Sequence, residues 1–258
     1  MTHKGSSGHV ALVGAGPGDA DLLTLKAVRM IRRATVVLAD DLVSDAVLRF
    51  VRRSARIVHV GKRGGCASTP QAFIEKLMAA EALKGERVVR LKGGDPFIFG
   101  RGGEEAEHLR AQGIEVEVVN GITSGLAAAT ALGAPLTHRD HAHGVIFVTA
   151  HSREGSAPLD WPTLGAAAAQ GLTLVIYMGV AAIEAVQCGL LQSMPGQTPA
   201  AVVQSVSLPH QRHAVCTLAT LAATTREEAL ASPSIIIVGN VLQGLQTLAQ
   251  SRARERAA

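Results

Sequence analysis

One stretch, residues 87–103 with the sequence RVVRLKGGDPFIFGRGG, constrains the fold of this chain most strongly. Its first apolar residues, Val88, Val89 and Leu91, are typical of a buried parallel strand. The strand must end at Gly93-Gly94-Asp95-Pro96, because glycines permit positive φ and close approach of a ligand, and proline cannot continue a ladder. Ligands of open α/β sheets bind outside the carboxyl ends of strands. We therefore interpret this loop as a ligand loop and prefer that to a glycine-rich turn without a ligand.

The composition sets the class of protein. The chain has 258 residues, 47% of them apolar, which suits one large or two medium α/β domains. No apolar run is long enough to cross a membrane, and the first nine residues lack the apolar segment of a signal peptide. Cys66, Cys188 and Cys216 are far apart and odd in number, which predicts neither a disulfide framework nor a metal site. Together these features predict a cytoplasmic protein without a membrane partner.

The charge excludes one partner and is compatible with another. A net charge of +4 and an aromatic content of 3% are too low to indicate nucleic acid. The excess of cations is compatible with a small anionic substrate, provided that the cations gather at one site.

Apolar runs alternate with helical periodicity along the first half of the chain. We expect strands near residues 10–13, 35–38, 56–60, 88–91 and 114–119, and helices near 22–33, 44–51, 70–83 and 104–111. This alternation predicts a complete doubly wound unit. The second half alternates less regularly, with strands expected near 145–149, 172–177, 201–206, 213–217 and 234–238, and helices near 162–169, 181–191, 218–231 and 241–250. Pro135 interrupts the pattern, so we predict α/β domains at 8–134 and 137–245 and a basic tail at 246–258.

A second candidate loop, Gly14-Ala15-Gly16-Pro17-Gly18-Asp19, follows the first predicted strand. It resembles a dinucleotide-binding fingerprint, but Asp19 stands where the third glycine belongs, and Pro17 lacks the N–H that would face a phosphate. A nicotinamide dehydrogenase is therefore disfavoured. We expect a tight turn that still permits a non-phosphate ligand to approach the backbone.

Charged residues follow the next two predicted strands. Asp40 and Asp41 are candidates for a general base or a binding site, or for a helix N-terminal cap, and the residues alone leave both interpretations open. Lys62 and Arg63 stand between glycines, where they could hold carboxylates or form a solvated basic loop. We slightly prefer the first.

Three further residues lie where predicted strands and helices meet. Thr123 and Ser124 lie at a helix start, where their hydroxyls and the free N–H groups could hold a ligand or simply cap the helix. Met178 follows a strand and could pack on a flat ligand or in the core. The stretch from His138 to His143 contains metal-ligating residue types, but its spacing matches no familiar site, so we predict a basic loop and no metal.

The strings VGAGPGDADLLTLKA, VGKRGG, VVRLKGGDPFIFGRGGEE, GITSGLAAAT, PLTHRD and VIYMG, read in order, resemble the tetrapyrrole methylase family. The resemblance covers roughly residues 8–245. The string RLKGGDPFIFGRGGEE together with PLTHRD is more specific to the branch that methylates uroporphyrinogen. The resemblance implies two α/β domains with S-adenosyl-L-methionine in the cleft between them. It also implies S-adenosyl-L-homocysteine as product, a polyanionic tetrapyrrole substrate and a homodimer.

The resemblance also assigns roles to residues. It implies a cofactor site lined by Pro17, Gly93, Gly94, Asp95, Ile98, Thr123, Ser124, Met178 and Val206. It places the proton acceptor on Asp40 and the proton donor on Lys62. We further expect the substrate carboxylates to be held by Arg63, Arg101, His138 and Arg139.

The chain departs from the family pattern at three places. Ala39 and Asp41 flank Asp40 where the family usually has tyrosine and arginine. Val206-Ser207 replaces a glycine-threonine pair, and Asn120 stands where proline is common. A methylase of a later corrin intermediate and a non-catalytic binding protein are the competing interpretations.

Overall fold

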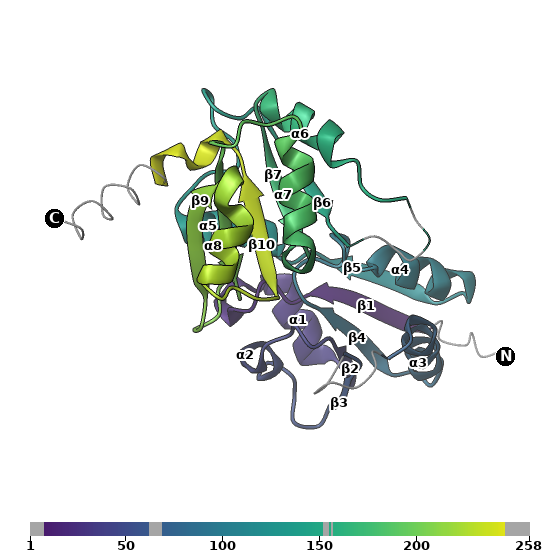
Figure 1. Cartoon of the computed structure of the whole chain (residues 1–258). Coiled ribbons are helices and arrows are strands. Elements are labelled where there is room, and N and C mark those ends of the chain that lie inside the picture. The colour runs from purple at the N-terminus through teal and green to yellow at the C-terminus, as the bar shows by residue number, and fades with distance from the viewer. Residues whose placement is uncertain (1–7, 62–68, 152–154, 156, 246–258) are drawn as a thin grey trace, which may run out of the picture. The chain divides into compact units, whose positions relative to one another are not determined.

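The computed structural model describes residues 8–61, 69–151, 155 and 157–245. By its internal contacts the chain divides into two compact units, Met1–Thr123 and Ser124–Ala258 (Figure 1). The sequence placed this boundary near Pro135, whereas the structure places it before helix α5 (Ser124–Leu132). The reason is that α5 packs on the second unit, where the Gly125 N–H donates to the Tyr177 hydroxyl at 2.8 Å. The predicted tail, 246–258, lies outside the described residues.

The first unit is a parallel five-stranded sheet with the order β3-β2-β4-β1-β5. Its strands are β1 (His9–Gly14), β2 (Val36–Ala39), β3 (Arg56–His59), β4 (Arg87–Lys92) and β5 (Glu115–Val119). Its helices are α1 (Leu25–Arg33), α2 (Asp45–Leu48), α3 (Gln71–Leu83) and α4 (Gly102–Ala111). The doubly wound prediction is confirmed. Because all five strands run the same way, all five carboxyl ends lie at one edge of the sheet.

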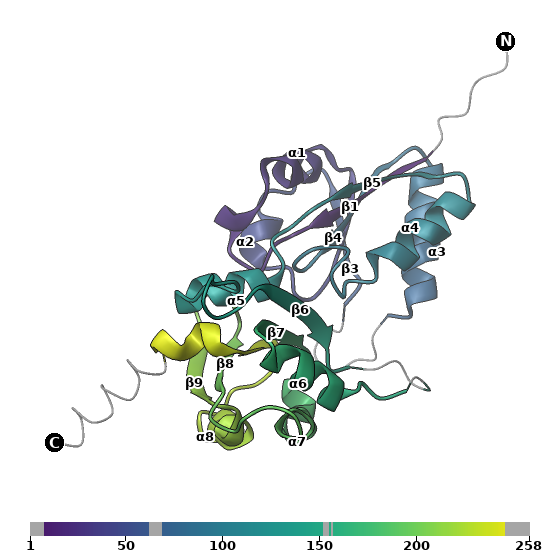
Figure 2. The ribbon, with the colours of Figure 1, turned by 90° about the horizontal axis from the view of Figure 1, so that it is seen from above.

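Both faces of this sheet are covered by helices, with α1 and α2 on one face and α3 and α4 on the other (Figure 2). Alternate residues of a strand point to opposite faces. Accordingly Val10 and Leu12 pack in the core that contains residues of α3 and α4, whereas Ala11 and Val13 pack in the core that contains residues of α1 and α2. Two buried faces explain why these strands read as continuous apolar runs.

The second unit is a mixed sheet with the order β6-β7-β10-β8-β9. Its strands are β6 (Gly144–Thr149), β7 (Leu172–Tyr177), β8 (Pro199–Gln204), β9 (Arg212–Thr217) and β10 (Ser234–Val238). Its remaining helices are α6 (Trp161–Ala169), α7 (Ile183–Leu191) and α8 (Leu221–Glu227). Only β6 and β7 pair in parallel; the other neighbouring pairs are antiparallel.

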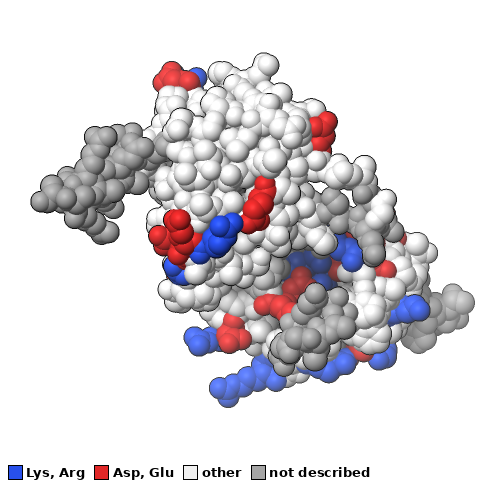
Figure 3. Space-filling view, viewed as in Figure 1, with Lys and Arg blue, Asp and Glu red and all other residues white. Residues whose placement is uncertain are grey.

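The core of the second unit contains residues of β7, β8, β10, α7 and α8, among them Ile176, Val202, Ile236, Leu190 and Leu221. α6 and α7 contain one charged residue between them, Glu184, and the surface over them is largely uncharged in Figure 3. No helix in the described part of the chain combines the length and apolar character needed to cross a bilayer.

Two helices are about half as long as the sequence predicted. The helix expected at 218–231 is a short 3-10 turn followed by α8, which ends at Glu227 because the chain reverses through Ala229 at φ 47°. The helix expected at 44–51 covers only α2, whose N-cap is Ser44.

Candidate active site

Three loops meet at the carboxyl edge of the first unit's sheet. The loops after β1 and β4 are joined by a two-way bridge, in which Gly16 donates to the Gly94 carbonyl at 3.1 Å and Gly94 donates to the Gly16 carbonyl at 2.8 Å. The Ala15 N–H adds a bond to the Lys92 carbonyl at 2.7 Å. Pro17 and the predicted ligand loop at 93–98 are therefore neighbours.

Glycine is required where these backbones touch. Gly16 and Gly94 have φ of 70° and 68°, the left-handed region that side chains rarely adopt. A Cβ built on Gly14 would lie 2.7 Å from the Gly94 carbonyl oxygen, and one on Gly121, in the loop after β5, would come closer still. The three loops thus pack main chain against main chain.

Asp95 binds these loops together. Its Oδ1 accepts the Phe97 N–H at 2.8 Å, and its Oδ2 accepts the Gly121 N–H at 3.1 Å and the Asn120 side-chain amide at 3.2 Å. The carboxylate is buried and shapes the loop from within. Asn120, one of the departures from the family pattern, is a side-chain donor to Asp95. A proline there would lack this side-chain donor.

The far end of the same loop presents an arginine and the aromatic ring of Phe97. Pro96, Phe97, Gly102 and Gly103 line a shallow open hollow with Arg101 and Glu104. The Arg101 guanidinium is bound on two nitrogens by Glu104, at 3.0 and 2.6 Å, and this carboxylate raises the pKa of Arg101. The side chain expected to hold a substrate carboxylate therefore already holds a carboxylate of its own chain.

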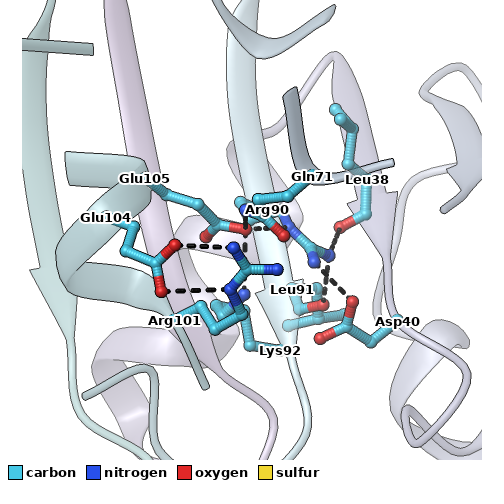
Figure 4. A network of polar contacts seen from close by, with 9 residues as sticks. All are labelled: Leu38, Asp40, Gln71, Arg90, Leu91, Lys92, Arg101, Glu104 and Glu105. Carbon is cyan, nitrogen blue, oxygen red and sulfur yellow. Dashed lines mark hydrogen bonds and ion pairs between the residues drawn. The ribbon is translucent and has the colours of Figure 1, made fainter. Parts of the chain in front are cut away.

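Asp40 follows β2 and faces a buried guanidinium. Arg90, on the neighbouring strand β4, forms an ion pair with Asp40, and its Nε donates to Glu105 Oε1 at 3.1 Å (Figure 4). Lys92 Nζ reaches the same Glu105 oxygen at 3.0 Å. The interpretation of Asp40 as a helix cap is wrong, because the Ser44 hydroxyl accepts the Val47 N–H and caps α2.

The sequence analysis missed Arg90, Lys92 and Glu105. A signal was present, since Arg90 and Lys92 are two residues apart in the strand and so must lie on one face of the sheet. Two charges on a buried face require a counter-charge from the covering helix, here Glu105 of α4.

Burial lowers the pKa of Lys92 below its ordinary value of 10.5, and the neighbouring Arg90 lowers it further, while Glu105 and Asp40 oppose the shift. Between the lowered pKa and 10.5 the unfolded chain binds more protons than the folded one, so the free energy of unfolding rises with pH there. We expect this rise to be smaller in Lys92→Met than in the wild type, as measured by urea unfolding across this pH window. Lys26→Met, at an exposed lysine of α1, is the control and should follow the wild type. Parallel curves for the wild type and Lys92→Met would contradict the shift.

The second unit gathers three predicted cofactor residues at one edge of its own sheet. β10 is antiparallel to both β7 and β8, so Met178 and Val206, which follow those two strands, extend from the same edge. Ser124 begins α5 at that edge, because the next residue, Gly125, is bonded to Tyr177 at the end of β7.

The backbone of this edge is strained. Met178, Ser205 and Ser207 have φ of 54°, 51° and 64°, although none of them is glycine. Such strain is held by the surrounding structure and is frequent at ligand sites. Met178 is half-exposed, whereas the Val206 side chain is buried, which leaves mainly the backbone of Val206 for a ligand.

Two predicted substrate residues lie elsewhere in this unit. His138 and Arg139 precede β6, and His143 donates to the Gly171 carbonyl just before β7, so the segment lies by the amino-terminal ends of these two parallel strands. Met178 extends from the opposite edge. The His138 ring stacks on His141 at 4.6 Å and accepts the Asp140 N–H. In the described segments no three His, Cys, Asp or Glu side chains are grouped so as to hold a metal.

The remaining predicted residues belong to the first unit. The first unit brings together Pro17, Gly93, Gly94, Asp95, Ile98 and Thr123 at the edge that also carries Asp40. Lys62 and Arg63 lie outside the described residues.

Comparison with known proteins identifies the family. The family of tetrapyrrole (corrin/porphyrin) methylases matches residues 9–222. The chain belongs to the tetrapyrrole methylases. The predicted resemblance and the predicted fold of two α/β domains are therefore confirmed.

Two relatives are similar over nearly all of this chain. A uroporphyrinogen-III C-methyltransferase of Pseudomonas aeruginosa is 53% identical over 240 residues, which cover 93% of this chain and 96% of the relative. A siroheme synthase of Azotobacter vinelandii is 47% identical over 97% of this chain. The chain spans about half of that longer relative, 53% of its length.

Solved structures of other methylases share the fold. The uroporphyrin III C-methyl transferase of Thermus thermophilus is 39% identical with a TM-score of 0.77, covering 92% of this chain and 99% of its own, and it has also been solved with S-adenosyl homocysteine. A cobalt precorrin-4 methyltransferase has a TM-score of 0.82 at 27% identity, over 94% of this chain and 99% of its own.

Proposed function

We propose that this chain is an S-adenosylmethionine-dependent C-methyltransferase that converts uroporphyrinogen III to precorrin-2 by two successive methylations, through precorrin-1. The observation that carries the proposal is 53% identity to a uroporphyrinogen-III C-methyltransferase across almost the whole length of both chains. The precorrin-4 methyltransferase superposes well, but at 27% identity its likeness supports the fold more than the substrate.

The loops of the first unit fit a cofactor that rests on the backbone. Gly14 and Gly121 leave no room for a Cβ between the loops. Gly93 and Gly94 are the first residues after β4, and Gly94 has a φ of 68°. We assign the cofactor to Pro17, Gly93, Gly94, Asp95, Ile98 and Thr123 in the first unit and to Ser124, Met178 and Val206 in the second. In this assignment Asp95 acts by shaping the loop, because its carboxylate is engaged by Phe97, Asn120 and Gly121.

The chemistry requires little covalent help from the protein. An electron-rich pyrrole carbon attacks the sulfonium methyl, the carbon–sulfur bond breaks, and S-adenosylhomocysteine leaves with the electron pair. The protein aligns carbon, methyl and sulfur, and then accepts the proton that the macrocycle must lose. Asp40, at the same sheet edge as the cofactor loops, is the proposed acceptor, and Lys62 is the proposed donor.

The substrate carries several carboxylates, and cations at the site would bind them. Arg101, Arg63, His138 and Arg139 are the proposed ligands. Arg101 has the best structural support, since it lines a hollow beside the cofactor loop. His138 and Arg139 have the least, since they lie at the opposite edge of their sheet from Met178.

Arg101→Ala should raise the substrate KM or lower kcat by about tenfold, because the charge-assisted contact proposed between Arg101 and a substrate carboxylate is lost. The measurement is steady-state kinetics with uroporphyrinogen III. Arg226→Ala, which removes another exposed arginine paired with a glutamate, is the matched control and should leave both constants unchanged. Wild-type kinetics in Arg101→Ala would remove Arg101 from the substrate site.

The proposed function is tested by incubating the protein with methyl-labelled S-adenosylmethionine and uroporphyrinogen III. The expected product has gained two methyl groups at carbon. A protein that binds both molecules without transfer would be the non-catalytic binding protein, and transfer only to a later corrin intermediate would identify the related methylase.

We also propose that the enzyme works in the cytoplasm as a homodimer. Support for this comes from the family resemblance and the cysteine pattern of the sequence. Light scattering of the purified protein measures the mass directly, and a monomer at micromolar concentration would contradict the dimer.

A further inference from the structure

A buried ion cluster lies directly behind Asp40. We define it as Arg90 and Lys92 of β4 with Glu105 of α4, whose side chains are 3%, 3% and 0% exposed (Figure 4). Asp40, at 29% side-chain exposure, is an acidic partner of this cluster that also reaches solvent.

Stability alone does not explain the cluster. Buried ion pairs are often no more stabilising than apolar residues of the same size, because the charges lose their hydration. Glu105 Oε1 accepts three donors, from Arg90, Lys92 and Gln71, while Oε2 has no partner among the described residues. A half-satisfied buried carboxylate costs free energy, so such a group needs another reason to be there.

The geometry supplies that reason. Arg90 Nε is bound by Glu105, and Nη1 donates to the carbonyls of Leu38 and Leu91 at 3.4 Å. With the guanidinium plane fixed at these points, Nη2 is aimed at Asp40 Oδ1. The Asp40 backbone is held separately, by its N–H to the Leu91 carbonyl at 3.1 Å. Asp40 is thus held by both its backbone and its side chain, which together fix the orientation of its carboxylate.

We propose that Arg90, braced by Glu105, is a positioning residue that holds the Asp40 carboxylate in the one orientation in which it accepts the substrate's proton. This inference rests on the proposed function, in which Asp40 is the acceptor. Glu105 acts through Arg90, and it supplies the counter-charge that lets both Arg90 and Lys92 remain buried.

The test compares Arg90→Met and Arg90→Lys with a matched control, Arg56→Met. Arg56 pairs with the buried Glu81 of α3 but lies at the start of β3, at the opposite edge of the same parallel sheet. Each variant is measured for kcat, substrate KM, the Kd of S-adenosylmethionine and the free energy of unfolding. Arg90→Met is also made in an Asp40→Asn background and assayed in single turnovers with labelled methyl.

We expect Arg90→Met to lower kcat about tenfold or more, since misplacing a reacting group is costly, while the cofactor Kd stays within about twofold. Arg90→Lys, which keeps the positive charge but lacks the forked guanidinium group, should have a kcat between those of the wild type and Arg90→Met. Arg56→Met should lower stability and leave kcat unchanged. In the Asp40→Asn background Arg90→Met should lower the residual rate no further, because Arg90 acts through Asp40.

Two results would overturn the inference. The first is a wild-type kcat in Arg90→Met or, if that variant does not fold, in Arg90→Lys. The second is that Arg90→Met lowers the rate of methyl transfer by the same factor in the wild-type and Asp40→Asn backgrounds, which would show that Arg90 does not act through Asp40. A wild-type chain that transfers no methyl group would instead overturn the proposed function. In that case the free energies of unfolding of Arg90→Met, Asp40→Asn and the double variant would still show, through their coupling, whether Arg90 holds Asp40.

Discussion

Asp40→Asn is expected to lose turnover by about a hundredfold or more, the usual range for removing a general base, while S-adenosylmethionine still binds with nearly its wild-type Kd. The amide keeps the size of the carboxylate but is a very weak base, so the proton of the methylated macrocycle has no acceptor at that position. The measurement combines transfer of labelled methyl with calorimetry of cofactor binding.

The structure adds a second consequence of this variant. Asp40 is the counter-charge of the buried Arg90, so the substitution also weakens an ion pair. We expect a loss of about 1–3 kcal/mol in unfolding free energy, the range for a hydrogen bond to a charged group. Kinetics must therefore be compared at a temperature at which both proteins are fully folded.

Asp41→Asn is the matched control, because Asp41 is the adjacent acid, is exposed, and has no part in the buried ion cluster. Its turnover should equal that of the wild type. If Asp40→Asn turned over normally as well, Asp40 would be only a partner of Arg90, and the proton acceptor would have to be sought elsewhere.

The strands and the glycine turns that follow them could be predicted because they depend on local pattern. Buried parallel strands require continuous apolar runs, and the turn at Gly93-Gly94 requires positive φ, so both leave clear marks in the sequence. The end of α8 was harder to predict, because the chain reversal at Ala229 has no glycine or proline at the turning residue to mark it.

The contacts between strands could not be predicted, because they depend on the order of the strands in the sheet. Asp40 meets Arg90 only because β2 lies next to β4. Asp95 meets Asn120 and Gly121 only because β1 holds the ends of β4 and β5 on its two sides. Similarly, His138 and Arg139 lie where they do because of the direction of β6, and the string PLTHRD gives no information about that direction.

Gly94→Ala should weaken cofactor binding about tenfold or more, because an alanine resists the left-handed backbone that this position needs. At φ 68°, Gly94 both donates to and accepts from Gly16, and its carbonyl packs against Gly14 and Gly121. Moving that carbonyl would separate all three loops at once. Calorimetry with S-adenosylmethionine measures the change in Kd.

Gly85→Ala is the control that separates the loss of cofactor affinity expected at Gly94 from the loss of stability expected for any alanine in the left-handed conformation. Gly85 has φ of 85° after α3, and a Cβ there would meet nothing within 4 Å. Both variants should lose about 1 kcal/mol of stability to the left-handed conformation, yet only Gly94→Ala should lose cofactor affinity. Equal cofactor affinity in the two variants would mean that the loop at 93–98 is shaped like a cradle but does not bind the cofactor, and the assignment of Gly93, Gly94 and Ile98 would fall with it.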